Sequence, residues 1–271
     1  MSKTYRGTAV VTGASTGIGL ATARALQAAG YRVFGTSRRG NAAGVDGVTM
    51  LSCDVTDDAS VQKVVADVVE QAGRLDVLVN NAGVGLFAAA EESSIGQVKA
   101  LFDVNFLGAV RMTNAVLPVM RRQGNGRIIN LSSILGLIPA PYSAIYSATK
   151  HAVEGYSESL DHEVRSFGIR VILVEPAFTR TNFEDNLTRP DAPLTVYDAM
   201  RGSVEASVRD GLLKGDSPDV VGAVVVRAAT AHTPRRRYTA GDVARRIGFL
   251  RRFVPEAAFD KSLRKQMRLP A

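Results

Sequence analysis

The chain alternates short apolar segments with longer segments of helical periodicity. Apolar residues recur about every three to four positions, as on one face of a helix, in residues 18–30, 59–73, 95–122 and 143–167. The apolar segments have the length of strands and lie at 8–12, 31–36, 48–53, 77–80, 126–132 and 170–175. These strands are nearly all apolar rather than alternating, as expected when helices cover both faces of a sheet. The pattern predicts an α/β fold, a doubly wound, Rossmann-like parallel sheet.

The pattern also predicts one long loop outside the sheet, over residues 177–217. No linker rich in Pro, Gly or Ser divides the chain, so a single domain over residues 1–271 is predicted. Residues 177–217 carry scattered prolines and polar residues, which is typical of a substrate loop. The loop also has apolar side chains that indicate a pocket for a bulky ketone, aldehyde or lipid-derived alcohol, namely Phe178, Phe183, Leu187, Leu194, Val196 and Tyr197.

The predicted C-terminal extension, residues 242–269, is helical and basic. Its two helices, over 242–254 and 256–269, each have an apolar face. These faces consist of Val243, Ile247, Leu250 and Val254 in the first helix and of Phe259, Leu263 and Met267 in the second. We expect the faces to cover the substrate cleft or a neighbouring subunit, with the arginines in solvent. Peripheral contact with an anionic membrane is the alternative.

Charge and composition exclude several classes of protein. The net charge is +7, but residues 232–271 alone carry +8 and the rest carries −1, so the main body gives no sign of nucleic-acid binding. No secretory signal is visible, and the longest apolar run, 220–231, is too short for a membrane span and contains Arg227. One cysteine, Cys53, excludes an internal disulfide framework, and the three histidines have no metal-ligand spacing. A cytoplasmic protein without a metal is expected.

A glycine-rich turn follows the first strand. The segment VTGASTGIG places Gly13, Gly17 and Gly19 between that strand and the next helix. Glycine permits positive φ and lets the backbone approach a phosphate closely, while the helix start offers free N–H groups to it. A nucleotide site is therefore predicted; a glycine-rich turn without a ligand is the alternative.

The second strand ends in GTSRRG, where this fold is expected to carry an acid for the adenosine ribose. Here the residues are Ser37, Arg38 and Arg39. An acidic side chain at this position would repel a 2′-phosphate, whereas Ser37 carries no charge. The Arg38 guanidinium can bind a phosphate with two hydrogen bonds. NADP(H) is therefore predicted as the cofactor, with Arg39 a solvated neighbour.

Six motifs in order resemble those of the short-chain dehydrogenase/reductase family. They are TGASTGIG (12–19), CDV (53–55), NNAG (80–83), VNFLG (104–108), NLSSILG (130–136) and YSATK (146–150). With a related segment reaching Thr181, they span about two-thirds of the chain. The resemblance implies an enzyme that interconverts a carbonyl and an alcohol with a nicotinamide cofactor, and a homodimer or homotetramer that uses the helices at 95–122 and 143–167.

Tyr146 and Lys150 are four residues apart on a predicted helix and share a face. An ammonium near a phenol lowers its pKa, so Lys150 is expected to lower that of Tyr146. Taken alone, the pair could equally be a surface pair; the resemblance implies that Tyr146 is the acid–base catalyst and that Lys150 also holds the nicotinamide ribose. Tyr142 has no cation four residues later.

Two further residues complete the implied catalytic set. Strand alternation lets only one of Ser132 and Ser133 face the site, and the resemblance selects Ser133 to orient the substrate oxygen. It also implies that Asn105 bends its helix or holds a water that links Lys150 to solvent.

The resemblance also implies the cofactor contacts. Asp54, next to Val55, would accept a hydrogen bond from adenine. The segment EPAFTRT has Ala177 where the family has glycine. The remaining predicted contacts are Ser15, Thr16 and Ile18 in the glycine turn, Asn81, Ala82 and Gly83 along the ribose, and Pro176, Thr179 and Thr181 near the carboxamide.

The predicted function is an NADP(H)-dependent oxidoreductase acting on a small-molecule carbonyl or alcohol. A catalytically silent NADP-binding regulator on the same fold is one alternative, because fold alone does not imply activity. An adaptor that acts at a membrane surface through the basic extension is the other.

Overall fold

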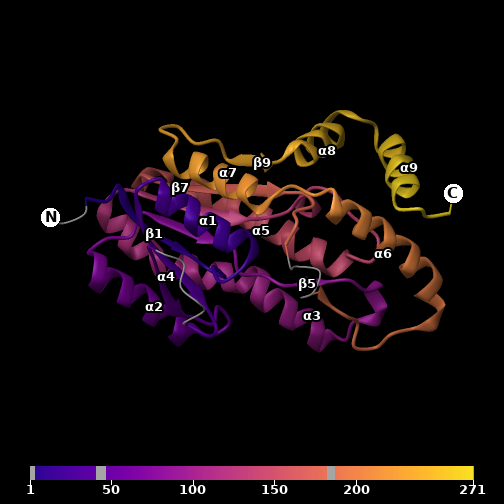
Figure 1. The fold of residues 1–271 in the computed structure, drawn as a ribbon, viewed down its shortest axis with the longest axis horizontal. Helices are drawn as coiled ribbons and strands as arrows, with labels where there is room; N and C mark the ends of the chain where they lie inside the picture. Colours follow the sequence, from indigo (N-terminus) through magenta and orange to yellow (C-terminus); the bar gives the residue numbers. More distant parts are fainter. Residues whose placement is uncertain (1–3, 41–46, 182–186, 271) are drawn as a thin grey trace.

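A computed structural model describes residues 4–40, 47–181 and 187–270. In these ranges, seven strands form one parallel sheet in the order β3-β2-β1-β4-β6-β7-β9 (Figure 1). The strands are β1 (Gly7–Val11), β2 (Tyr31–Ser37), β3 (Val48–Ser52), β4 (Val77–Asn80), β6 (Gly126–Leu131), β7 (Ile169–Pro176) and β9 (Arg237–Ala240). The predicted fold class is confirmed, and all six predicted strands agree with the structure to within one residue at either end.

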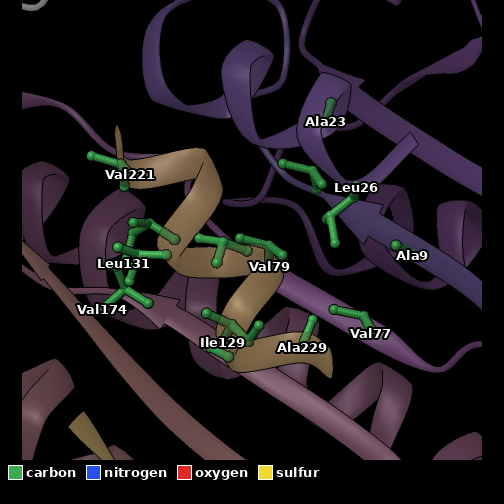
Figure 2. Packing of buried hydrophobic residues seen from close by; sticks show 14 of the residues in the cluster. Ala9, Ala23, Leu26, Val77, Val79, Ile129, Leu131, Val174, Val221 and Ala229 are labelled. Carbon is green, nitrogen blue, oxygen red and sulfur yellow. The ribbon is translucent and has the colours of Figure 1, made fainter. Parts of the chain in front are cut away.

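Helices cover both faces of the sheet. Helices α1 (Gly17–Ala28) and α7 (Pro218–Thr230) pack on one face, and α2 (Asp58–Ala72), α4 (Gly108–Gln123) and α5 (Ala144–Val164) on the other. Figure 2 shows the first of these layers, where apolar side chains of α1 and α7 meet those of β1, β4, β6 and β7. Because each central strand is buried on two sides, its sequence is mostly apolar and does not alternate.

The α2 helix shows how local sequence sets an element's limits. The Asp57 carboxylate accepts hydrogen bonds from the N–H groups of Ala59 and Ser60, which caps the helix start. The helix ends at Gly73, whose φ of 70° is left-handed. The predicted apolar face is confirmed, since Val61, Val64, Val65 and Val68 are all buried.

The predicted helix over 95–122 is divided into three parts. Helix α3 (Ile95–Phe102) passes into a π-helical turn (Asp103–Leu107) and then into α4. The turn is centred on Asn105, where the sequence predicts a bend. The predicted helix over 143–167 is α5 followed by a 3₁₀ turn, Arg165–Phe167.

The structure contains elements that the sequence pattern does not predict. Strand β9 adds an edge strand to the sheet, and helix α7 packs on the sheet beside α1. Helix α6 (Asp198–Leu213) lies within the predicted loop 177–217. The short strand β8 (Leu187–Thr188) of that loop pairs with β5 (Gly85–Leu86). The pattern fails for α6 because, of its residues, only Val204 is buried. Phe183, expected in the substrate pocket, lies outside the described residues.

The basic extension forms α8 (Asp242–Phe253) and α9 (Glu256–Gln266), which lie beyond β9 at the edge of the molecule (Figure 1). The predicted apolar face of the second helix is confirmed, because Met267 and Leu263 pack with Phe87, Tyr142 and Val204. The predicted face of the first helix agrees only in part with the structure: Ile247, Leu250 and Val254 are half-buried, but Val243 is exposed, and the fully buried residue of α8 is Ala244. No helix in the described part of the chain is long and apolar enough to span a bilayer.

Candidate active site

The predicted site residues gather at the carboxyl edge of the sheet. The chain runs from β1 to β2 and β3 in one direction and from β4 to β6 and β7 in the other, so the strand order reverses between β1 and β4. In open α/β sheets, ligands bind at the carboxyl ends of the strands beside such a reversal. The glycine turn follows β1 at this point.

The glycine turn is shaped so that only glycine fits at two positions. Gly13 has a φ of 65°, and a Cβ on it would lie 3.0 Å from the Cα of Ala82. A Cβ on Gly19 would lie 2.1 Å from the Gly13 carbonyl oxygen. The turn continues through Ser15 and Thr16 into Gly17 and Ile18, the first residues of α1, and no acidic side chain occupies the first turn of this helix. The result is an open helix start suited to an anion.

A residue that the sequence reasoning missed fixes this turn. The Thr12 hydroxyl accepts hydrogen bonds from the N–H groups of Asn81 and Ala82, both at 2.9 Å. The Asn81 amide donates in return to the carbonyl oxygens of Thr12 and Gly13, at 2.8 and 3.1 Å. The only signal for Thr12 in the sequence is its place between the strand and the first glycine. Asn81 therefore braces the turn through its side chain.

The adenosine side of the site carries the Asp54 carboxylate, which lies near Arg38 and Arg111. Hydrogen bonds from the N–H and hydroxyl of Thr56 lower the pKa of Asp54, and the charge of Arg38 lowers it further. Arg38 and Arg39 are exposed at the end of β2, and Ser37 is half-buried. Asp54 is thus ionised and already engaged by Thr56, and Arg38 lies close enough to act on it.

Asn105 connects the π turn to the segment after β4. Its side-chain oxygen accepts a hydrogen bond from Val84 N–H at 2.8 Å, and its amide donates to the Val84 carbonyl oxygen at 2.9 Å. A Cβ on Gly83 would lie 3.2 Å from that side-chain oxygen. Val55 packs against Gly108 of α4: a Cβ on Gly108 would lie 2.8 Å from the Cγ2 atom of Val55. Asn105 thus fixes the backbone path at Gly83.

Ser133, Tyr146 and Lys150 converge from β6 and α5. The Ser133 side chain forms a hydrogen bond with the Tyr146 phenol. The Lys150 ammonium donates to the Leu131 carbonyl oxygen at 2.9 Å and lies 5.7 Å from the centre of the Tyr146 ring. Ser132 is buried, and its side chain lies beside Gly136 and Glu154 instead. The structure therefore brings together a hydroxyl, a phenol and an ammonium.

The expected effect of Lys150 on Tyr146 is wrong in this structure. Burial raises the pKa of Tyr146 to about 12, and the hydrogen bond with Ser133 offsets only part of that rise. Burial also lowers the pKa of Lys150 to about 8, because a low-dielectric site disfavours the charged form. The ammonium points to the Leu131 carbonyl, so desolvation outweighs its attraction for a phenolate. Tyr146 is therefore a protonated acid at neutral pH.

A buried acidic cluster lies behind this group and was not predicted. Glu154, one turn after Lys150, and Glu175, at the end of β7, both bind Arg237 of β9, at 2.7 and 3.1 Å. Glu158 also pairs with Arg237, at 3.0 Å. Burial, together with the charge of Glu154, raises the pKa of Glu175 to about 7, although Arg237 offsets part of the rise. The sequence gives no signal for this cluster, because its residues are distant along the chain.

This cluster makes stability depend on pH. The folded-state pKa of Glu175 lies above the unfolded value, so the stability linked to its proton is present below about pH 4.5 and is lost as the pH rises through about 7. This pH dependence of the free energy of unfolding amounts to up to about 3 kcal/mol, and we expect Glu175→Gln to remove it. Urea unfolding at pH 5 and pH 8 measures it: the variant should gain stability over the wild type at the higher pH. A gain that is equal at both pH values would contradict this assignment, and the exposed Glu70→Gln serves as control.

The segment after β7 approaches the glycine turn. Pro176 ends the strand, and the Thr179 hydroxyl donates to the Ala177 carbonyl oxygen at 3.2 Å. A Cβ on Gly17 would lie 3.4 Å from the Thr181 side chain. Among the described residues other than glycine, only Tyr142 and Arg268 have positive φ, so Ala177 is compatible with its backbone. The departure from the family's glycine therefore introduces no strain.

Hydrogen bonds and an ion pair to Glu92 anchor the predicted substrate loop. Glu92 is fully buried and accepts hydrogen bonds from Leu194 N–H at 2.8 Å and from Arg201 of α6. Burial raises the pKa of Glu92, but these bonds and that from Ala89 N–H outweigh it and lower the pKa. The Glu92–Arg201 ion pair thus anchors the loop. Tyr197 of the loop also packs in an aromatic cluster with Tyr142 and Phe87. Within the described ranges, no group of three or more His, Cys, Asp or Glu side chains is arranged so that it could hold a metal ion.

Comparison with known proteins identifies related sequences. The family described as short chain dehydrogenase matches residues 7–192. A 3-ketodihydrosphingosine reductase of Bacteroides thetaiotaomicron is 46% identical over 177 residues, which span 65% of each chain.

Solved structures share the fold over most of the chain. A short-chain dehydrogenase from Streptomyces avermitilis is 34% identical with a TM-score of 0.82, covering 99% of this chain and 96% of the other. A short-chain dehydrogenase/reductase from Burkholderia phymatum in complex with NAD is 28% identical, with a TM-score of 0.77 and coverage of 93% and 95%. A metagenomic short-chain oxidoreductase in complex with NADP is 29% identical, with a TM-score of 0.68 and coverage of 88% and 98%.

Proposed function

The chain belongs to the short-chain dehydrogenase/reductase family, and from this premise we propose that it is an NADPH-dependent reductase of a ketone or aldehyde with an apolar, lipid-like body. The observation that carries the proposal is the convergence of Ser133, Tyr146 and Lys150 at the carboxyl edge of the sheet, beside the glycine turn. Ser133 supplies an orienting hydroxyl, Tyr146 a proton donor and Lys150 a cation.

The residues present fit a nicotinamide dinucleotide. A Cβ would fill the cradle at Gly13 and Gly19, and the start of α1 has no acidic side chain to repel a pyrophosphate. The related structures hold NAD or NADP, so they leave the choice of cofactor open. The end of β2 supports NADP, because Ser37 stands where an acid would exclude a 2′-phosphate and Arg38 is exposed beside it.

The chain's own groups divide the chemistry of reduction. When bound, NADPH supplies a hydride to the carbonyl carbon. Ser133 orients the carbonyl oxygen with its hydroxyl, and Tyr146 donates its proton to that oxygen. Lys150 stabilises the resulting phenolate with its positive charge. Since the pKa of Tyr146 is about 12, the acid is in its protonated form across the physiological range.

The pH profile should follow Lys150 rather than Tyr146. We expect kcat for carbonyl reduction to fall as the pH rises above about 8, where Lys150 loses its charge. In Lys150→Arg the charge persists above pH 12, so the residual activity should show no such fall. Initial rates at saturating NADPH and substrate test this. A fall near pH 8 that persists in Lys150→Arg would assign that pKa to the phenol instead.

The apolar surroundings support the proposed substrate class. The substrate loop contributes Leu187 and Tyr197 to a cluster with Phe87, Tyr142 and Met267. This cluster is largely buried, but the same loop also exposes Leu194, Val196 and Met200, and such apolar side chains favour an apolar substrate. The name of the Bacteroides relative, a 3-ketodihydrosphingosine reductase, is in keeping with reduction of a ketone on a lipid.

A carbonyl panel assayed with NADPH and NADH separately tests the proposal. Long-chain 3-ketones and aldehydes should be reduced faster than short polar ones of the same carbonyl type, and NADPH should give the higher kcat/KM. Reduction of polar carbonyls only would contradict the substrate class. Cofactor binding without turnover on any carbonyl or alcohol would contradict the enzyme itself and favour a silent regulator.

A further inference from the structure

One side of α8 faces solvent and carries two phenylalanines among arginines. Phe249 and Phe253 are 61% and 64% exposed, and their ring centroids lie 4.7 Å apart. Arg245, Arg246 and Arg252 are exposed on the same side, since residues three, four and seven positions apart share a helix face. These five residues form the α8 outer face.

The opposite side of α8 is fixed to the body of the protein. Ala244 is fully buried, and a Cβ on Gly248 would lie 3.7 Å from Thr239 and 3.9 Å from Leu137. Small residues at these two positions let the helix approach β9 and the turn after Ser133 closely. The outer face is therefore held outward by packing on the inner side.

The described chain does not cover the outer face. Helix α9 packs its own apolar side on the body through Leu263 and Met267, and it meets α8 where Arg251 lies 5.6 Å from the centre of the Phe259 ring. Arg252 lies 5.7 Å from the centre of the Phe253 ring, on the solvent side. Exposed aromatic rings in contact with one another are uncommon on a monomer and mark an interaction surface.

The charge of α8 decides which partner fits. The helix has four arginines against one acidic residue, Asp242. A second copy bound through the same face would bring these cations together, which disfavours self-association. Phenylalanines can insert below lipid headgroups while flanking arginines reach the phosphates, an arrangement typical of helices that lie in a membrane interface. We propose that the α8 outer face docks the protein on an anionic lipid surface.

Docking would place the active site near the lipid. The inner side of α8 lies against Leu137 and the 3₁₀ turn Ile134–Gly136 that precedes it, and this turn directly follows Ser133. If the proposed reductase function is right, a lipid-like substrate would reach the site from the surface on which the enzyme rests. Binding to lipid is itself independent of that function and is measured without turnover.

Sedimentation of the full chain with vesicles tests the proposal. Vesicles of phosphatidylcholine alone are compared with vesicles that also contain about 30% phosphatidylserine. The wild type should bind the anionic vesicles at least about tenfold more tightly. Phe249→Ser with Phe253→Ser should lower that affinity about tenfold, and Arg245→Gln with Arg246→Gln and Arg252→Gln should abolish the preference for anionic lipid.

Matched controls remove equivalent side chains elsewhere. Ile95→Ser with Leu213→Ser deletes two apolar side chains that are 70% and 71% exposed, and Arg24→Gln with Arg121→Gln and Arg122→Gln deletes three exposed arginines. Both controls should bind like the wild type. Circular dichroism and cofactor binding verify that every variant is folded.

Several results would overturn the proposal. Equal binding to both vesicle types would do so, as would aromatic variants that bind as the wild type does. Loss of a dimer in the aromatic variant, measured without vesicles by sedimentation equilibrium, would assign the face to a second copy. Binding of a DNA duplex that depends on the same arginines, with no vesicle binding, would assign the face to nucleic acid.

Discussion

Replacing Tyr146 with phenylalanine is expected to lower kcat for carbonyl reduction by about 10³-fold and to leave the affinity for NADPH nearly unchanged. The substitution removes the only atom that can pass a proton to the substrate oxygen from this position. It keeps the ring beside Lys150, whose ammonium stays on the Leu131 carbonyl oxygen. Steady-state rates and fluorescence titration of NADPH measure the two effects.

Tyr142→Phe is the matched control for this prediction. Tyr142 stands four residues earlier, before α5 begins, and it is buried in the cluster with Phe87 and Tyr197. Its loss should lower kcat by less than about threefold, because the hydroxyl has no part in proton transfer. A Tyr146→Phe variant as active as the wild type, or one no worse than Tyr142→Phe, would remove Tyr146 from the mechanism.

Replacing Arg38 with alanine is expected to raise the Kd for NADPH about 100-fold and that for NADH by less than about threefold. A guanidinium that binds a phosphate with charge-assisted hydrogen bonds contributes up to about 3 kcal/mol, which corresponds to this change. NADH has no 2′-phosphate, so it loses nothing at this position. Titration of each cofactor into the variant and the wild type gives the ratio directly.

Arg39→Ala separates a specific contact from general charge. Arg39 is adjacent and equally exposed, so it contributes a similar long-range attraction for an anion. It should change the Kd for NADPH only about twofold, and the effect should vanish in salt. Equal losses of NADPH and NADH affinity in Arg38→Ala would show that this arginine does not read the phosphate.

The central fold could be predicted because burial on two faces leaves a plain pattern in the sequence. Strands such as 77–80 and 126–131 are mostly apolar rather than alternating, and Gly13 and Gly19 stand where the backbone has no room for a side chain. The positions of Tyr146 and Lys150 on one helix follow from their spacing alone.

The remaining features depend on contacts that spacing does not encode. Strand β9 is short and lies at the edge of the sheet, and α6 buries too little to leave a periodic pattern. Glu154 and Glu175 meet only because β7, β9 and α5 are adjacent in space. The pKa of Tyr146 was predicted with the wrong sign, because the direction of the Lys150 ammonium and the depth of burial are properties of the folded chain.

The proposed reaction joins direct hydride transfer to a carbonyl carbon with proton donation by Tyr146. Reduction of the best carbonyl of the panel with NADPH that carries deuterium at both hydrogen positions of the nicotinamide C4, followed by mass spectrometry and NMR of the alcohol, measures this directly. The wild type should place one deuterium on the carbinol carbon and none elsewhere, and Tyr146→Phe should form no alcohol on the same timescale. Alcohol without deuterium, or NADPH oxidation without alcohol, would contradict the account.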